Sequence, residues 1–343
     1  MRLSICIPQY NRIGFLLRNL SIIEKQNFTD LEVVVSDDCS ADETEVKIKE
    51  LVPNYKHRLI YHRFEQNQGY DRNFRKCIEL ASGEYVIVIG NDDSINPDYD
   101  LKTLEDFLSN NNLPDLGFTN FIEEETGKMI DRAKTTDLLG SGYETAMKYY
   151  SCFSFVGGLI YKKSFFENFN SSKHDGSIYA QIYLGCLMTC SGGKLFSIKE
   201  PVVIKDIVLE EVKRDTYRDF IAKSWKDYKP GNGGLLSVIN VLIDAFRDAG
   251  VLNQARIYRV FKRIYGITFP FWILDYKSNK ALPAAVGLFQ GMKPTNSTNY
   301  KLLSSFNAFR IWVVYLTVGI TALLMPVFLF RKLKTWLYSI VKK

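Results

Sequence analysis

Short apolar runs alternate with helix-like stretches along residues 1–100. The runs are rich in β-branched and aromatic residues, a composition typical of strands that are buried on both faces. Apolar residues between the runs recur at helical spacing, as at Ile13, Leu16 and Leu20. Because strands that alternate with helices pair in parallel through right-handed crossovers, we expect an α/β fold with a mainly parallel sheet flanked by helices. The predicted strands are 3–7, 32–36, 59–64, 85–89, 115–121 and 155–161.

Turn and cap signals predict where several helices begin and end. Ser40 and Glu43 have the spacing of a capping box. Gly83 is expected to end a helix in the left-handed conformation. Pro97, preceded by Asn96, predicts the first turn of another helix.

Polar residues follow three of the predicted strands at the point where each strand ends. Asp37 and Asp38 follow the second strand, Asp92 and Asp93 follow the fourth, and a polar turn that includes Tyr10 follows the first. The carboxyl ends of parallel strands meet at one edge of a sheet, where open α/β sheets bind ligands. Paired carboxylates there supply the oxygen ligands that Mg²⁺ and Mn²⁺ take when they carry phosphates. The alternative is that these aspartates form Asx turns that only shape the loops.

Composition and spacing exclude several classes of protein. The 46% hydrophobic and 24% charged residues are those of a folded chain with a sizeable core. The net charge of +6 is not concentrated in basic runs interleaved with aromatics, so nucleic acid is not an expected partner. The turn after the first strand lacks the glycines of a nicotinamide dehydrogenase. The six cysteines lack zinc or secreted-framework spacing and no signal-peptide pattern is present, so we expect the catalytic part to stay in the cytosol.

Four segments in order carry a resemblance to a known family. They are P-x-Y-N-R at 8–12, V-V-S-D-D-x-S-x-D at 34–42, N-x-G at 67–69, and A-S-G-E-Y followed by D-D-x-x-x-P at 81–97. Together they resemble the family 2 glycosyltransferases of GT-A fold. The N-Q-G-Y-D-R-N segment and the lack of an acidic residue at position 90 are similar to the abequosyltransferase-like branch, which builds bacterial O-antigen units.

The resemblance implies a nucleoside-diphosphate sugar as donor, Mn²⁺ or Mg²⁺ on its diphosphate, and inversion at the anomeric carbon. It implies that Asp92 is the metal ligand. Asp37 would accept a hydrogen bond from the base, Asp38 would shape the turn, and Arg72 would approach the diphosphate. Gly90 stands where the family pattern has an acidic residue, so the donor contact of that residue is lost or moved. The remaining residues implied to bind the donor are Pro8, Tyr10, Asn11, Arg12, Asn91 and Asp93.

Sugar transfer also needs a base for the proton of the acceptor hydroxyl. The segment F-V-G-G-L-I-Y-K-K-S-F-F followed by His174 and Asp175 is similar to the acceptor half of the family, in which a carboxylate at a helix start acts as base. We therefore expect Asp175 to begin a helix and to be the base, the alternative being a simple N-cap. Glu123 and Glu124 are rival bases in an acidic stretch, 122–142, that we expect to be an exposed loop.

The C-terminal third is expected to be helical and membrane-associated. A proline- and glycine-rich break at 230–234 predicts a boundary between a transferase domain and a partly amphipathic helical region. The predicted parts are 1–229, 230–310, and a membrane-associated helix with a cationic tail, 311–343.

Ile311 to Phe330 carries no charge and is long enough to cross a bilayer, the alternative being a buried core helix. The cationic tail after it prefers the cytoplasmic side, where the catalytic part is also expected, and one crossing cannot satisfy both. Pro326 within this stretch favours a kinked or re-entrant helix, or one that lies in the interface with its tail on anionic lipid. We expect membrane attachment without a full crossing.

These inferences predict an inverting glycosyltransferase at the cytoplasmic face of the inner membrane, with a lipid-linked oligosaccharide as acceptor, in bacterial surface polysaccharide synthesis. Two alternatives stay open. A sugar-phosphate nucleotidyltransferase should carry a glycine- and lysine-rich loop after the first strand, where this chain has P-Q-Y-N-R. A degenerate transferase that acts as a non-catalytic membrane assembly partner would be compatible with Gly90.

Overall fold

The computed structural model describes residues 1–209 and 234–333 of a chain that divides into two compact units. The first unit is Met1–Lys213 and the second is Arg214–Lys343. The break expected at 230–234 lies, except for its last residue, outside the described residues, so the three-part division of the chain stays a prediction.

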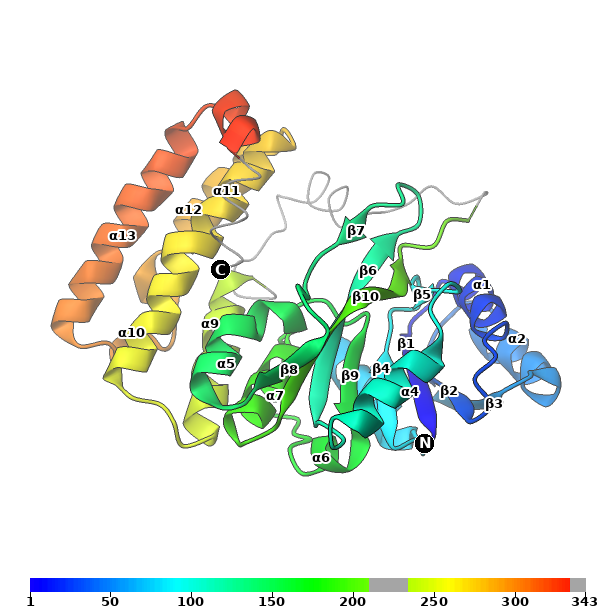
Figure 1. Ribbon diagram of the computed structural model, residues 1–343. Helices are drawn as coiled ribbons and strands as arrows, with labels where there is room; N and C mark the ends of the chain where they lie inside the picture. The colour runs from blue at the N-terminus through cyan, green and yellow to red at the C-terminus, as the bar shows by residue number, and fades with distance from the viewer. Residues whose placement is uncertain (210–233, 334–343) are drawn as a thin grey trace. The chain divides into compact units, whose positions relative to one another are not determined.

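The first unit is built on one sheet, which begins with four parallel strands (Figure 1). They are β1 (Leu3–Gln9), β2 (Leu31–Asp37), β3 (Arg58–Arg63) and β4 (Tyr85–Val88). Their order in the sheet is β3-β2-β1-β4, and the apolar residues of β1, β2 and β4 are buried. Gln9, the last residue of β1, lies opposite Asp37, the last residue of β2. The polar residues that follow these strands therefore share one edge of the sheet, as the sequence predicted.

The remainder of the sheet is mixed, so the parallel arrangement is confined to part of it. Its strands are β5 (Ser94–Ile95), β6 (Leu116–Glu123), β7 (Met129–Ile130), β8 (Asp137–Gly140), β9 (Leu159–Lys162) and β10 (Leu195–Lys205). β9 runs antiparallel between β4 and β6, and β10 is parallel to β6 but antiparallel to β5 and β8. Because β7 and β8 lie within 122–142, part of the expected loop is paired as strand.

Helices connect the strands of this unit, and most bury one apolar side, whereas α7 is buried almost all round. In α1, for example, Leu16, Leu20 and Ile23 enter the core formed with β1 and β2. The helices are α1 (Ile13–Ile23), α2 (Thr44–Leu51), α3 (Tyr70–Leu80), α4 (Leu101–Asn110), α5 (Gly142–Tyr149), α6 (Lys163–Glu167) and α7 (Ala180–Cys190).

The helix expected at Pro97 begins four residues later. α4 starts at Leu101, and its N-cap is Asp100, whose side chain accepts from the N–H of Lys102. Asn96 does not cap α4. Its side-chain oxygen accepts from the N–H of Asp98 at 3.2 Å, in the turn before the helix, and its side-chain amide donates to the carbonyl of Pro201 on β10. The prediction for Pro97 was wrong because a tertiary contact fixes the residues before the helix.

Two other predicted caps serve different purposes. Ser40 does not cap α2, because its hydroxyl donates to Asp37 at 2.5 Å. Gly83 is not left-handed, and α3 already ends at Leu80. A Cβ at Gly83 would lie 2.3 Å from the Ser4 hydroxyl oxygen, so glycine is required there by a close approach to β1.

The second unit is helical, as expected, and is held together by aromatic rings. Its described helices are α9 (Leu235–Asp248), α10 (Gln254–Arg263), α11 (Phe269–Ser278), α12 (Leu282–Gly291) and α13 (Ser305–Leu324). A π-helical segment, Ile264–Thr268, joins α10 to α11. The ring of Tyr315 on α13 lies 4.9 Å from that of Phe289 on α12 and 5.7 Å from that of Phe269 on α11. The stacked rings fix three helices against one another.

α13 is apolar on two opposite sides but packs through only one of them. Among the described residues it is the one helix long and apolar enough to cross a membrane. It buries Ile311, Tyr315, Gly319 and Ala322. Its exposed apolar residues are Phe306, Phe309, Val313, Leu316, Ile320 and Leu324, which we call the α13 stripe.

The end of α13 is capped by a lysine from another helix. The helix stops at Leu324, and Pro326 separates it from further helical residues, 327–333. The Lys277 ammonium of α11 donates to the carbonyls of Ala322, Leu323 and Met325 at 2.5 to 2.9 Å. A cation at a helix C-terminus satisfies open carbonyls and complements the helix dipole.

Candidate active site

The turn after β1 has an unusual backbone that the loop after β2 holds in place. Asn11 and Arg12 have φ angles of 52° and 58°, which residues with side chains rarely adopt. The N–H of Asn11 donates to the Ser40 hydroxyl at 2.7 Å, and the Asn11 side-chain oxygen accepts from the N–H of Ala41 at 2.9 Å. Tyr10, beside this turn, is 49% exposed, so its ring is available to a ligand.

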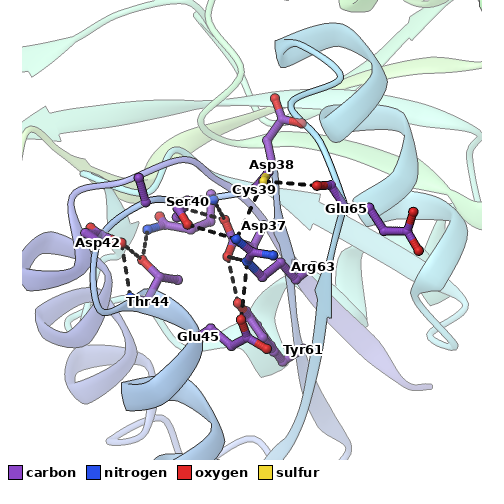
Figure 2. A network of polar contacts seen from close by, with 12 residues as sticks. Asp37, Asp38, Cys39, Ser40, Asp42, Thr44, Glu45, Tyr61, Arg63 and Glu65 are labelled. Atoms are coloured by element: carbon purple, nitrogen blue, oxygen red, sulfur yellow. Dashed lines mark hydrogen bonds and ion pairs between the residues drawn. The ribbon is translucent and has the colours of Figure 1, made fainter.

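Asp37 lies at the centre of a polar network (Figure 2). One of its oxygens accepts from the N–H and the hydroxyl of Ser40, and the other accepts from the Tyr61 hydroxyl at 2.6 Å. The Arg63 guanidinium adds a positive charge 3.8 Å away. Burial, together with the hydrogen bond to Asp37, raises the pKa of Tyr61 well above its ordinary value. The fully buried Asp37 therefore shapes the loop after β2.

Asp38 fixes the segment before α3, which is the turn-shaping role that the resemblance implies. Its two oxygens accept from the N–H groups of Gln68 and Gly69 at 2.6 and 2.9 Å. Gly69 has a φ of 83°, which glycine adopts without strain. Pro8 lies opposite Ser36 in the pairing of β1 with β2, at the same edge of the sheet.

The turn after β4 reaches the turn after β1 through two side-chain contacts. The Arg12 guanidinium lies 2.7 Å from Oδ2 of Asp92. The side-chain amide of Asn91 donates to Oε1 of Gln9 at 2.9 Å. The turn after β1 therefore touches both the loop after β2 and the Asp92 turn, so three segments that are distant in the sequence meet at one edge.

Asp93 is a buried support of this turn. Its Oδ2 accepts from the N–H of Gly90 at 3.2 Å and its Oδ1 from the N–H of Asp206 at 3.1 Å. The N–H of Ile207 donates to the carbonyl of Asp92, which fastens the turn to the end of β10. Burial raises the pKa of Asp93 to about 7, and the negative charge of Asp92 adds to the shift. The implied donor-binding residue Asp93 is thus placed beneath the turn.

Asp92 fits a divalent cation that arrives together with a diphosphate. Its side chain is 32% exposed, and Oδ1 has no hydrogen-bond donor among the described residues. No group of three or more His, Cys, Asp or Glu side chains in the described ranges could hold an ion by itself. Mg²⁺ is usually bound through one or two carboxylates, with phosphates and waters as its other ligands. The donor would therefore have to supply most of the coordination.

Arg72 is not brought to the Asp92 turn. Its guanidinium bonds Glu79 of the same helix at 2.7 Å. With His62 and Lys76 it lines an open cavity of about 480 Å³ beside β3. The diphosphate contact implied for Arg72 finds no support in these contacts, and the arginine next to Asp92 is Arg12.

Asp175 lies before α7 and not at its first turn, contrary to the expectation. α7 begins at Ala180, whereas the Asp175 carboxylate is bound by Arg75 of α3. The two hydrogen bonds are 2.9 Å from Nε to Oδ1 and 2.5 Å from Nη2 to Oδ2. Arg75 is buried and also donates to Asn170, so the segment that carries Asp175 is fixed against α3.

Asp71 takes the capping role that was the alternative for Asp175. Its carboxylate accepts from the N–H of Ile178 at 2.7 Å and from that of Ala180 at 3.1 Å. These bonds satisfy main-chain donors that a helix start leaves open. Burial raises the pKa of Asp71 above its ordinary value. Sequence reasoning missed this residue, although Asp71 and Arg75 are charged at i, i+4 on the buried side of α3.

A family model described as Glycosyl transferase family 2 matches residues 4–167, from β1 to α6. The match includes the turns that carry Tyr10, Asp37 and Asp92. The chain contains a family 2 glycosyltransferase domain.

Curated relatives that match part of this chain are named as glycosyltransferases. Abequosyltransferase RfbV of Salmonella typhimurium is 40% identical over 111 residues, which are 32% of this chain and 33% of that protein. GalNAc(5)-diNAcBac-PP-undecaprenol beta-1,3-glucosyltransferase of Campylobacter jejuni is 32% identical over 94 residues, 27% of this chain and 30% of that protein. The chain thus spans about a third of the length of these relatives.

Solved structures show that the fold is of the GT-A type. TarS 1–349 of S. aureus, in complex with UDP-GlcNAc, has a TM-score of 0.61 at 18% identity, over 94% of this chain and 91% of that chain. Mannosyltransferase PcManGT of Pyrobaculum calidifontis, in complex with GDP-Man and Mn²⁺, has a TM-score of 0.51 at 14% identity, over 94% and 87%. The GT-A fold expected from the sequence is confirmed.

In this transferase domain, position 90 has no room for the acidic side chain that the family pattern places there. A Cβ at residue 90 would lie 2.8 Å from Oδ2 of Asp93 and 3.1 Å from Oδ1 of Asp92. Asp93 cannot give way, because it is buried and held by two main-chain N–H groups. Glycine is therefore required by the packing of two carboxylates on one turn.

Arg132 of the transferase domain was missed by sequence reasoning, which placed it in an exposed loop. Burial of its guanidinium lowers its pKa to about 10, so Arg132 stays charged at neutral pH. A Cβ at Gly157 would lie 2.9 Å from Oδ2 of Asp93, so the backbone that Arg132 holds packs against the Asp92 turn. The guanidinium donates to the carbonyls of Thr119, Cys152, Phe155 and Gly157.

The two rival bases of the transferase domain have other partners. Glu124 is bound by the Arg18 guanidinium at 2.5 and 2.7 Å and accepts from the N–H of Val208. Glu123 accepts from the Thr126 hydroxyl at 2.6 Å. Both carboxylates therefore hold their own loop and its neighbours in place.

Proposed function

We propose that the protein is a metal-dependent, inverting glycosyltransferase that moves a sugar from a nucleoside-diphosphate donor to a lipid-linked saccharide in bacterial surface polysaccharide synthesis. The observation that carries the proposal is the contact between the turns after β1 and β4, where Arg12 meets Asp92. That contact joins the partly exposed carboxylate of Asp92 to the turn that follows the exposed Tyr10, at the carboxyl edge of the sheet in a family 2 domain.

Donor binding is assigned to the residues at this edge. Tyr10 and Asn11, with Pro8, would line the nucleoside, and Arg12 would contact the diphosphate. Asp92 would hold Mn²⁺ or Mg²⁺, an ion that neutralises charge on the leaving diphosphate when it is bound. TarS and PcManGT were solved with UDP-GlcNAc and with GDP-Man and Mn²⁺, which supports a nucleotide-sugar donor and a divalent ion.

Acceptor activation is assigned to Asp175. Its carboxylate would take the proton of the acceptor hydroxyl as the hydroxyl oxygen bonds to the anomeric carbon and the bond to the diphosphate breaks, which inverts that carbon. Arg75 keeps the carboxylate in one orientation through two hydrogen bonds. Carboxylate oxygens have lone pairs beyond those that Arg75 uses, so a hydroxyl can still approach.

The second unit supports attachment to the membrane surface without a crossing. The α13 stripe is an exposed apolar face, with Phe306 70% and Phe309 67% exposed. α13 also packs against α10, and the guanidinium of Arg310 lies over the Tyr258 ring at 4.5 Å. α10 carries four cationic residues, and each would cost about 2.5–3.5 kcal/mol at the centre of a bilayer. A helix tied to such a neighbour is suited to lie in the interface.

Attachment to the membrane supports the proposal of a lipid-linked acceptor at the cytoplasmic face of the inner membrane. An enzyme held at the surface stays near an acceptor on a polyprenyl diphosphate, and nucleotide sugars are cytoplasmic substrates. The Campylobacter jejuni relative is named for a PP-undecaprenol acceptor, which supports the same class. Part of the cationic tail, Lys334 to Lys343, lies outside the described residues.

A thermal-shift screen of the full chain tests the proposal. We expect one of UDP, GDP, CDP or dTDP to raise the melting temperature with Mn²⁺ present and to have little effect with EDTA, because a bound ligand stabilises by mass action. The nucleotide sugar of the active base should then label lipid extracts in a Mn²⁺-dependent reaction. Binding without turnover would favour the non-catalytic assembly partner, and no metal-dependent binding would contradict the assignment.

A further inference from the structure

Arg12 is bound to the residue assigned to the metal. Its Nη1 lies 2.7 Å from Oδ2 of Asp92, and the described residues provide no other side-chain partner for this guanidinium. Arg12 therefore covers one of the two oxygens that a cation at Asp92 would use. The other oxygen, Oδ1, has no hydrogen-bond donor within the described ranges.

The backbone aims Arg12 at Asp92 in a strained conformation. Asn11 and Arg12 are consecutive residues with positive φ, which is unfavourable for both. The hydrogen bonds from Asn11 to Ser40 and from Ala41 to Asn11 keep this turn in place. The fold thus fixes where the Arg12 side chain starts, while 46% of that side chain is exposed and free of packing.

We propose that Arg12 is an exchangeable counterion of Asp92, which it neutralises before the donor binds, and that it moves onto the donor diphosphate when a divalent cation takes its place. The inference rests on the proposed function and names the arginine that partners the leaving group. Two cations cannot share Oδ2 without repulsion, so binding of the ion displaces the guanidinium. Its planar fork of N–H donors matches phosphate oxygens.

The exposure of the pair makes this exchange easy. Arg12 and Asp92 are 46% and 32% exposed, and water screens ion pairs of this kind. Such pairs change an equilibrium by about fivefold or less, whereas a buried pair would block the ion. Arg12 should therefore weaken binding of a free cation slightly. The donor diphosphate offers Arg12 a new partner. The cation therefore binds together with the donor without the loss of affinity that displacing Arg12 would otherwise cause.

Binding of Mn²⁺ to the full chain without nucleotide, measured from the EPR signal of free Mn²⁺, tests the inference. We expect Arg12→Gln to bind Mn²⁺ about two- to fivefold more tightly than wild type. In the presence of Mn²⁺ the same variant should bind the nucleoside diphosphate identified by the thermal-shift screen more weakly. Arg12→Lys keeps the charge and should bind Mn²⁺ alone like wild type.

Arg18→Gln is the matched control. Arg18 lies on α1 and pairs with Glu124 at similar exposure, 32% and 23%, so the variant removes the same charge away from Asp92. It should leave Mn²⁺ affinity unchanged. Unchanged or weaker Mn²⁺ binding by Arg12→Gln, while wild type still shows Mn²⁺-dependent nucleotide binding, overturns the counterion role alone. Absence of that nucleotide binding in wild type overturns the proposed function as well.

Discussion

Arg75 binds both carboxylate oxygens of Asp175, although the two residues are 100 positions apart in the sequence. The arginine comes from α3, which also provides Asp71, the acceptor for two N–H groups at the start of α7. One helix thus orients the residue assigned as base and the helix that follows it.

Asp175→Asn should stop transfer and leave binding of the nucleoside diphosphate unchanged. The variant also leaves the buried Arg75 charge without its main partner, so we expect a loss of about 1–3 kcal/mol in the free energy of unfolding. Transfer assays and urea denaturation measure the two effects separately. Arg75→Gln combined with Asp175→Asn should recover stability without recovering transfer, and transfer by Asp175→Asn would move the base elsewhere.

Asp92→Asn should remove the Mn²⁺-dependent rise in melting temperature caused by the nucleoside diphosphate. The substitution keeps the shape of the side chain but removes the charge that attracts the ion, so transfer should fall by roughly 100-fold or more. The melting temperature without ligand should stay close to that of wild type. Asp106→Asn, at a 56% exposed position on α4, is the control and should retain both binding and transfer.

Gly90→Ala should destabilise the first unit and weaken Mn²⁺-dependent binding. The added Cβ would lie 2.8 Å from the held Asp93 carboxylate, and forced contacts of this kind cost about 1–3 kcal/mol. Gly287→Ala is the matched control, because a Cβ at that position on α12 meets no atom within 4 Å. Thermal melting should separate the two variants, and equal stability would show that the turn can relax.

Glu32→Gln should change the pH dependence of stability. Burial by itself would raise the pKa of Glu32, but hydrogen bonds from Ser4 and Ser82 and the charge of Arg58 outweigh it, and the pKa is lowered. A lowered folded-state pKa gives stability that is present above the ordinary value and is lost as pH falls through the folded value. The variant should therefore be less stable than wild type by about 1–3 kcal/mol near neutral pH.

The difference between Glu32→Gln and wild type should shrink as pH falls below about 4.5, which urea denaturation at a series of pH values can follow. Glu84→Gln, at an exposed position, is the control and should show no such trend. A difference that stays constant down to pH 3 would mean that the Glu32 charge contributes nothing.

Replacement of Phe306 and Phe309 by serine should reduce binding to vesicles that contain phosphatidylglycerol. Two exposed aromatic residues of the α13 stripe lose their apolar area, so we expect partitioning to fall by about tenfold or more. Val46→Ser removes a 58% exposed apolar side chain from α2 and serves as control. Vesicle sedimentation at two salt concentrations separates the apolar from the electrostatic contribution to binding. Unchanged binding of the double variant would show that the α13 stripe does not contact the membrane.

The periodic pattern predicted the first strands because burial on both faces leaves a clear signature in the sequence. The same pattern has no direction, so it could not show that β9 runs antiparallel between β4 and β6. The caps failed for a related reason. Ser40 and Asn96 have the right residue types for capping, but their side chains bond groups outside the two helices. The Ser40 hydroxyl donates to Asp37 at the end of β2, and the Asn96 side chain bonds the N–H of Asp98 and the carbonyl of Pro201.

In the candidate site, too, features that depend on local sequence were predictable and features that depend on distant contacts were not. The position of Asp92 at the edge of the sheet was predictable, because it follows a buried strand in a recognisable local motif. Its role as metal ligand stays a prediction. Arg132 and Asp71 were not predictable, because their hydrogen-bond partners lie on other elements and no local sequence pattern indicates them. The departure at Gly90 was visible in the sequence, but its cause, contact with Asp93, needed coordinates.

The cap that Lys277 provides to α13 has a mechanical consequence. Three hydrogen bonds to one helix end, with the stacked Tyr315 ring further along, prevent α13 from rolling about its own axis. The orientation of the α13 stripe is therefore set before anything docks on it. Whatever it meets encounters a preorganised face, and no rotational freedom of that helix is left to be lost on contact.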